Sequence, residues 1–86
     1  MSDLNVEIVT PDGVIFSGTA QSCTTPGVEG RFQVLKDHAP IVSTLEKGPV
    51  TIVKLDGSET TYEAEGGVVE LRQNKIILLV ESVRVD

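Results

Sequence analysis

Residues 50–64, VTIVKLDGSETTYEA, decide the fold of this chain. Two runs rich in β-branched and aromatic residues flank Asp56-Gly57, and Asp-Gly between two such runs is a strong short-range signal for a β-hairpin. The sequence therefore predicts an antiparallel pair of strands, one from Val50 to Leu55 and the other from Glu59 to Ala64.

Turn signals of the same kind recur at short intervals along the rest of the 86 residues. They leave no room for a long helix, and Val plus Ile outnumber Leu plus Ala by 19 to 10, which favours sheet. We expect one domain, residues 1–86, folded as an all-β antiparallel sandwich or flattened barrel of about eight to ten strands. The turn signals are Pro11-Asp12-Gly13, Pro26 to Gly30, Lys47-Gly48-Pro49, Gly66-Gly67 and Gln73-Asn74.

Two segments near the start of the chain carry more specific expectations. Leu4, Val6 and Ile8 alternate with polar residues, which predicts a strand with one buried face. Gly18 is expected at a bulge or bend. The Thr-rich, charge-free stretch 19–24 is expected to form a separate strand that another chain could cover on one side.

Composition excludes several classes of function. A net charge of −6 and a pI near 4.6 argue against a nucleic-acid partner, because phosphate backbones bind basic surfaces. No apolar run approaches the ~20 residues that span a bilayer, so lipid insertion is not expected. One Cys and one His exclude an internal disulfide and supply too few ligands for a structural zinc site. The single thiol and the lack of a secretory signal indicate a cytoplasmic compartment.

Candidate catalytic residues are few. Cys23 and His38 form the sole Cys/His pair, and no Lys, Arg or other His near Cys23 in sequence lowers its thiol pKa. We interpret Cys23 as a structural residue and His38 as a turn residue, and we predict no catalytic residue, no metal site and no cofactor. Two other hypotheses stay open: a stand-alone module that binds a small ligand or peptide, and an enzyme that uses His38 and Cys23.

From Pro26 to Pro40 the sequence is PGVEGRFQVLKDHAP, and together with its flanking motifs it resembles the amino-terminal domain of the epsilon subunit of F-type ATP synthases, called delta in mitochondria. Several short motifs occur in the family's order over the whole chain, which is more specific than any one of them. The matching segments are Phe16-Ser17-Gly18, Gly27-Val28-Glu29-Gly30, His38-Ala39-Pro40, Lys47-Gly48 and Gly66-Gly67-Val68-Val69-Glu70-Leu71.

The resemblance implies a ten-stranded β-sandwich at the foot of the central stalk, where it grips the gamma subunit and rests on the polar loops of the c-ring. The implied role is non-catalytic: the subunit helps to couple proton-driven rotation to ATP synthesis elsewhere in the complex. The implied location is peripheral to the inner membrane, or to a photosynthetic or cytoplasmic membrane, on its cytoplasmic side.

The resemblance also assigns contact residues. The end of the sandwich that faces the c-ring is expected to carry one turn and one corner, and the gamma contact is expected near two apolar segments. Arg31 departs from relatives that carry an acidic side chain, so Glu29 is expected to supply the attraction to the ring. The expected c-ring contacts are Gly27, Glu29, Gly30, Arg31, His38, Ala39 and Pro40, and the expected gamma contacts are Ile41, Val42, Gly66, Gly67 and Val68.

A second departure concerns the carboxy-terminal pair of α-helices that most epsilon subunits carry and that restrains ATP hydrolysis in relatives. The sequence stops at Asp86, where the sandwich is expected to end, so that helical pair and any nucleotide site on it are absent from these residues. Its Met1-Ser2 start favours a naturally short subunit over one domain of a longer protein.

Overall fold

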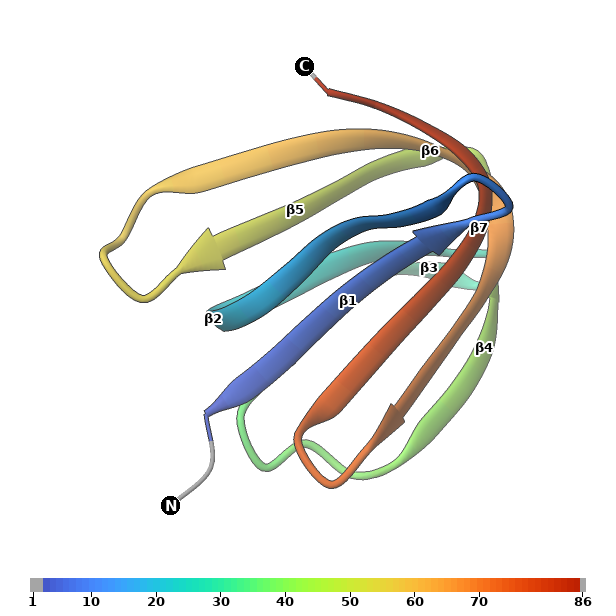
Figure 1. Ribbon diagram of the computed structural model, residues 1–86. Coiled ribbons are helices and arrows are strands. Elements are labelled where there is room, and N and C mark those ends of the chain that lie inside the picture. Colours follow the sequence, from blue (N-terminus) through green and yellow to red (C-terminus); the bar gives the residue numbers. More distant parts are fainter. Residues whose placement is uncertain (1–2, 86) are drawn as a thin grey trace.

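The computed structural model describes residues 3–85, which form seven β-strands and no helix (Figure 1). Neighbouring strands pair antiparallel except β1 and β7, which run parallel. The strands are β1 (Leu4–Thr10), β2 (Gly13–Gly27), β3 (Gly30–Leu35), β4 (Ile41–Leu45), β5 (Gly48–Lys54), β6 (Glu59–Arg72) and β7 (Lys75–Val85).

The strands form two layers. Three long strands, β2, β6 and β7, bend and cross from one layer to the other. Figure 1 shows β6 running across the top of the molecule and then turning down along its right-hand side. The first layer contains β4, β6 from residue 67, β7 to residue 80, β1, and β2 to residue 20. The second layer contains β3, β2 from residue 22, β5, β6 to residue 64, and the end of β7.

The expected all-β antiparallel sandwich is therefore confirmed, including the hairpin across Asp56-Gly57, in which Val53 pairs with Glu59. The strands number seven because two pairs of expected segments are continuous: residues 14–24 lie within β2, and residues 59–72 lie within β6. Counted by layer, the seven strands supply ten segments, five in each layer.

Glycine makes the bend in β6 sterically feasible. Gly66 and Gly67 have φ values of 49° and 146°, which L-residues with a side chain rarely adopt. A Cβ atom at residue 67 would overlap the carbonyl oxygen of Leu79 on β7. The absence of a side chain thus lets the two strands approach while both cross from one layer to the other.

The bend in β2 has a different cause, an extra residue in the strand. Ala20 pairs with Lys54 and Ser22 with Val53, so Gln21 is bulged out of the ladder. A second irregularity leaves Ile15 without a partner on β1, and the expectation of a bulge at Gly18 was wrong, since Gly18 pairs regularly with Val6.

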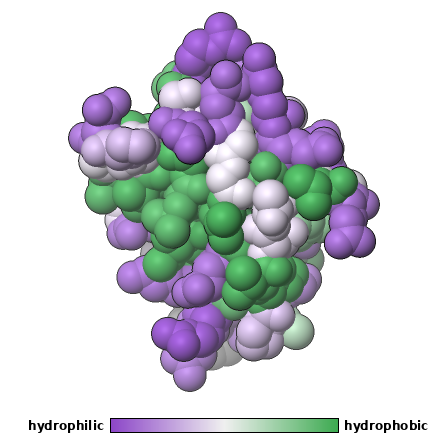
Figure 2. Space-filling model, turned by 90° about the vertical axis from the view of Figure 1, so that its right-hand side faces the viewer, coloured by the Kyte–Doolittle hydropathy of each residue, from purple (hydrophilic) through white to green (hydrophobic). Residues whose placement is uncertain are grey.

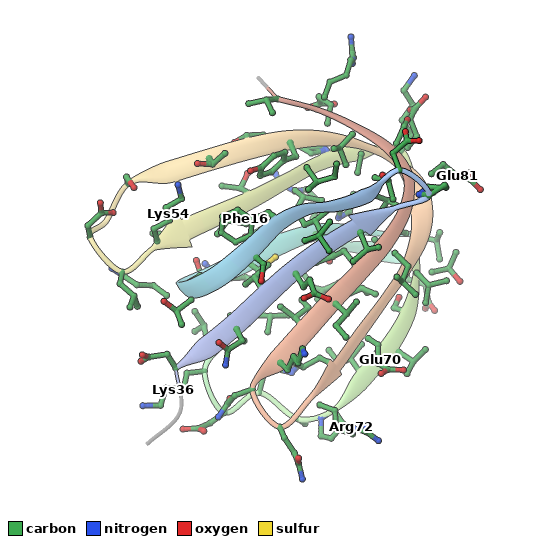
Figure 3. The ribbon with its side chains drawn as sticks, in the orientation of Figure 1. Phe16, Lys36, Lys54, Glu70, Arg72 and Glu81 are labelled. Carbon is green, nitrogen blue, oxygen red and sulfur yellow. The ribbon has the colours of Figure 1, made fainter. Side chains whose placement is uncertain are left out.

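The core lies between the two layers, and Leu4, Val6 and Ile8 are buried in it as predicted. Ser22, Cys23 and Thr24 of β2 pair with β3 on one edge and with β5 on the other, so strands of this chain flank that part of the Thr-rich segment. The expected cover by another chain on one side stays a prediction. Phe16 of one layer packs edge to face on Tyr62 of the other, with centroids 6.2 Å apart, and Lys54 lies 5.8 Å from the Phe16 centroid (Figure 3).

Gly67→Ala should destabilise the protein severely, by at least about 4 kcal/mol, because the new methyl group meets backbone rather than a movable side chain. Gly57→Ala is the matched control: its φ is also positive, at 89°, but nothing lies near its Cβ position, so the cost should be about 1 kcal/mol. Urea unfolding of both variants measures the difference. Equal costs would show that the contact with Leu79 is unimportant.

Thr25→Val should stabilise the protein by about 1 kcal/mol, because the buried Thr25 hydroxyl has no hydrogen-bond partner among the described residues. Thr51→Val is the control: the hydroxyls of Thr51 and Thr61 lie 3.2 Å apart, so the same substitution there should cost up to about 1 kcal/mol. Thermal unfolding of the two variants should shift in opposite directions. A destabilised Thr25→Val variant would contradict the assignment.

Candidate functional site

The Cys/His pair does not form a reactive site. Cys23 is fully buried in the core on β2, and burial raises the pKa of its thiol from the ordinary 9.0 to about 12. His38 is exposed, and its Nδ1 lies 2.7 Å from the carbonyl oxygen of Ala39. A buried neutral thiol is a poor nucleophile, which supports the structural interpretation of Cys23.

Other kinds of site are also missing from the part of the chain that the structure describes. Residues 3–85 contain no group of three or more His, Cys, Asp or Glu side chains placed to hold a metal ion. They contain no helix of the length and hydrophobicity needed to cross a membrane. The surface depressions found hold about 250 to 310 Å³ each and are open to solvent, unlike the deep apolar pocket expected of a small-ligand module.

An apolar stripe is the main feature of the outer face of the first layer. We define it as five residues that are direct cross-strand neighbours: Thr44, Val68, Leu79, Val9 and Val14. Val14, Leu79 and Val68 are 59%, 53% and 42% exposed. Figure 2 shows apolar surface gathered on this side of the molecule, bordered by hydrophilic residues. Exposed apolar side chains that adjoin one another in this way are typical of protein interfaces.

Charge is arranged in rows beside the apolar stripe. The adjacent row of the same face contains Val42, Glu70, Ile77 and Glu7, and the row after it contains Arg72 and Lys75. Glu70 and Arg72 both lie near the end of β6 (Figure 3). From the apolar stripe towards the β6–β7 turn, a bound partner would therefore contact apolar side chains, then the row that contains the two carboxylates, and then the two cations.

The expected gamma contacts divide between this face and the core. Val68 belongs to the apolar stripe, and Val42, 73% exposed, lies in the row beside it. Ile41 is half-buried and packs against the core, so it offers less surface than expected. Gly66 and Gly67 are half-buried at the bend of β6, where their role is conformational.

The turn expected to contact the c-ring is a two-residue hairpin loop, Val28-Glu29, between β2 and β3. Gly27 is buried, and a Cβ there would come within 2.8 Å of the Phe32 ring. Gly30 has a φ of 129°. The hairpin is tied to the end of β4, because the Val28 N–H donates to Thr44 O at 3.0 Å. Glu29 of this supported loop and the first two residues of β3, Gly30 and Arg31, are exposed.

The corner that contains His38, Ala39 and Pro40 lies at the other end of β3. All three residues are exposed. Our expectation that the turn and the corner share one end of the sandwich was wrong, because the length of β3 separates them. β3 pairs only with β2 among the described residues, so the seven expected ring residues lie within one edge strand or close to its two ends.

Sequence reasoning missed four residues of the apolar stripe: Val9, Val14, Thr44 and Leu79. Two of them could have been found from the sequence. Val9 stands at an outward position of its alternating strand, yet it is apolar. Leu79 belongs to a run, Ile76 to Val80, that is apolar on both faces of its strand. It also missed the pairing of Asp37 with Asn74, whose side chains hydrogen-bond at 3.1 Å across 37 positions of sequence.

The fold defines a class, the small two-layered β-sandwich, and comparison with known proteins identifies the family. The family model for the ATP synthase delta/epsilon chain, β-sandwich domain, matches residues 3–85. Since this match covers nearly the whole chain, the chain belongs to the delta/epsilon family of ATP synthase subunits.

Curated relatives agree with this assignment. The chain is 47% identical over 81 residues to the ATP synthase epsilon chain of Sulfurimonas denitrificans, a match that covers 94% of this chain and 62% of the relative. It is 46% identical over 78 residues to the epsilon chain of Chlorobaculum tepidum, covering 91% of this chain and 89% of the relative. The chain thus spans less than two thirds of the first relative and most of the second.

Solved structures confirm the fold. A chain in the Euglena gracilis mitochondrial ATP synthase, solved with OSCP, F1 and the c-ring, superposes with a TM-score of 0.93 at 17% identity. That match covers 99% of this chain and 54% of the other. A chain of the Tetrahymena thermophila central stalk and c-ring gives a TM-score of 0.81 at 16% identity, over 96% of this chain and 66% of the other.

Cys23 should make the protein less stable in alkali. The folded pKa of about 12 lies above the ordinary value, so the unfolded chain releases its thiol proton first and the free energy of unfolding falls once the pH exceeds about 9. The expected slope is about 1.4 kcal/mol per pH unit. Urea titrations from pH 8 to 11 measure it, and Cys23→Ala should lack that part of the slope. Identical slopes would contradict the burial of the thiol.

Proposed function

We propose that this chain is a non-catalytic central-stalk subunit of a rotary ATP synthase, which binds gamma and the c-ring and so helps to couple proton-driven rotation to ATP synthesis. The single observation that carries the proposal is the family match over residues 3–85. The only thiol of the chain, Cys23, is buried in the core, which agrees with a non-catalytic role. The proposed location is peripheral to the membrane, on its cytoplasmic side.

The apolar stripe is the proposed contact with gamma. It supports this role because it crosses five hydrogen-bonded strands, which gives a continuous surface on one packed layer. Val42 and Val68, two of the expected gamma contacts, lie in it or beside it. Burial of this surface against a partner would also add apolar contact to a small domain, which buries a smaller fraction of its surface than a large one does.

The c-ring contact is proposed along the β3 edge, by which we mean the loop Val28-Glu29, the strand β3 and the corner His38 to Pro40. The exposed Glu29 can accept hydrogen bonds from donors in the ring's polar loops, and Pro40 presents a corner that has no N–H to satisfy. The two ends of β3 would then contact neighbouring parts of the ring. No helix occurs in residues 3–85, so inhibition of ATP hydrolysis is not part of the proposal for them.

Leu79→Glu should weaken binding to gamma by at least about 30-fold, equivalent to about 2 kcal/mol, because it places a charge in the centre of the apolar stripe. The control is Leu55→Glu in the β5–β6 loop, where the leucine is 51% exposed, close to the 53% of Leu79. Co-expression with the cognate gamma subunit, followed by the mass of the purified complex and titration of the variants, measures both.

The wild-type chain is expected to form a one-to-one complex with gamma. A wild-type chain that stays monomeric beside folded gamma would refute the stalk role. If the complex forms and Leu79→Glu and Leu55→Glu bind equally well, the stalk role stands but the gamma contact lies elsewhere.

A further inference from the structure

Asn74 connects three segments that are far apart in the sequence. It lies in the tight turn between β6 and β7, and its carbonyl oxygen accepts a hydrogen bond from Asn5 N–H at 2.8 Å, at the start of β1. Its side chain reaches the corner between β3 and β4: Oδ1 accepts from the Asp37 N–H at 2.6 Å, and Nδ2 donates to Asp37 Oδ1 at 3.1 Å. The corner and the turn lie together at the lower end of the molecule in Figure 1.

Asp37 determines where the chain turns into the corner. Its φ is 66°, a left-handed conformation that Asp and Asn adopt more readily than most residues. The next residue, His38, donates its N–H to Leu35 O at 3.3 Å. The Asn74 side chain thus holds the backbone N–H and the side chain of Asp37 from outside the corner, and from there the chain continues to Ala39 and Pro40.

Both side chains of the pair are accessible to water, since Asp37 is exposed and Asn74 is half-buried. Water can therefore replace either partner, and breaking the pair leaves no buried polar group unsatisfied. The pair consequently contributes more to the shape of the corner than to the stability of the fold. A loop that is already ordered loses less conformational entropy on binding, so its affinity is higher.

We propose that Asp37 and Asn74 are positioning residues that hold the corner His38 to Pro40 in the conformation that binds the c-ring. This inference rests on the proposed ring contact along the β3 edge. It assigns a role to two residues that do not themselves need to touch the ring, and it makes the β6–β7 turn part of the binding architecture.

Removal of the side chain tests the proposal. Asn74→Gly abolishes both bonds to Asp37 and keeps the left-handed backbone of the turn, where the φ of Asn74 is 61°. Gln73→Gly is the matched control, since Gln73 precedes Asn74 in the same turn with a φ of 51°. The assay is binding of the complex of this chain with gamma to the detergent-solubilised cognate c-ring. We expect Asn74→Gly to weaken binding about tenfold and Gln73→Gly by about twofold or less.

Exchange of the two side chains tests the pair itself. Asn74→Asp alone places two carboxylates opposite each other and should weaken ring binding as much as Asn74→Gly. The double variant Asp37→Asn, Asn74→Asp has the wild-type net charge, and the carboxylate at position 74 can accept from both the backbone N–H and the side-chain amide at position 37. Ring affinity should return to within about twofold of wild type.

A readout without the ring separates this inference from the proposed function. The Asp37 amide should exchange hydrogen slowly in the wild type and in Gln73→Gly, and about tenfold faster in Asn74→Gly, whereas the melting temperature should change little. If the wild-type complex does not bind the ring, the ring contact itself is refuted, and this inference with it. If the wild type binds and Asn74→Gly binds equally well, or if the Asp37 amide is unprotected in the wild type, the positioning role alone is refuted.

Discussion

The close approach of β6 to β7 at Gly67 is the constraint on which the rest of the structure depends. Because residue 67 has no side chain, β6 can pass against the Leu79 carbonyl and change layer, and β7 changes layer beside it. Three bent strands then supply two layers from a short chain, and the core between them is closed without a helix.

The same bend creates the outer face that we propose as the gamma contact. Once β6 has turned, its outward positions align with those of β4, β7, β1 and β2. One residue from each strand, apolar in every strand except β4, which contributes Thr44, forms the apolar stripe. A continuous hydrogen-bonded layer underlies these side chains, so a load applied at the stripe is spread over several strands. This agrees with the proposed coupling role, because a packed sandwich deforms little.

The β3 edge differs from the apolar stripe in how it is held. Its hairpin loop is bonded to the end of β4, and its corner is bonded to the β6–β7 turn through Asp37 and Asn74. The two proposed contact regions thus share strands β4 and β6. The first layer therefore supports both proposed contact regions. The apolar stripe would bind through apolar contact, and the β3 edge would bind through polar contact.

The sequence by itself determined the fold class, the hairpin at Asp56-Gly57, the buried face of Leu4, Val6 and Ile8, and the family resemblance, because alternation and turn chemistry are local properties. Only the tertiary structure decided that residues 14–24 are one strand with its bulge at Gln21, that the turn and the corner lie at opposite ends of β3, and that Leu79 completes an apolar stripe with Val9 and Val14. It also decided the pairing of Asp37 with Asn74. These features depend on register and on contacts between distant segments, which no local pattern encodes.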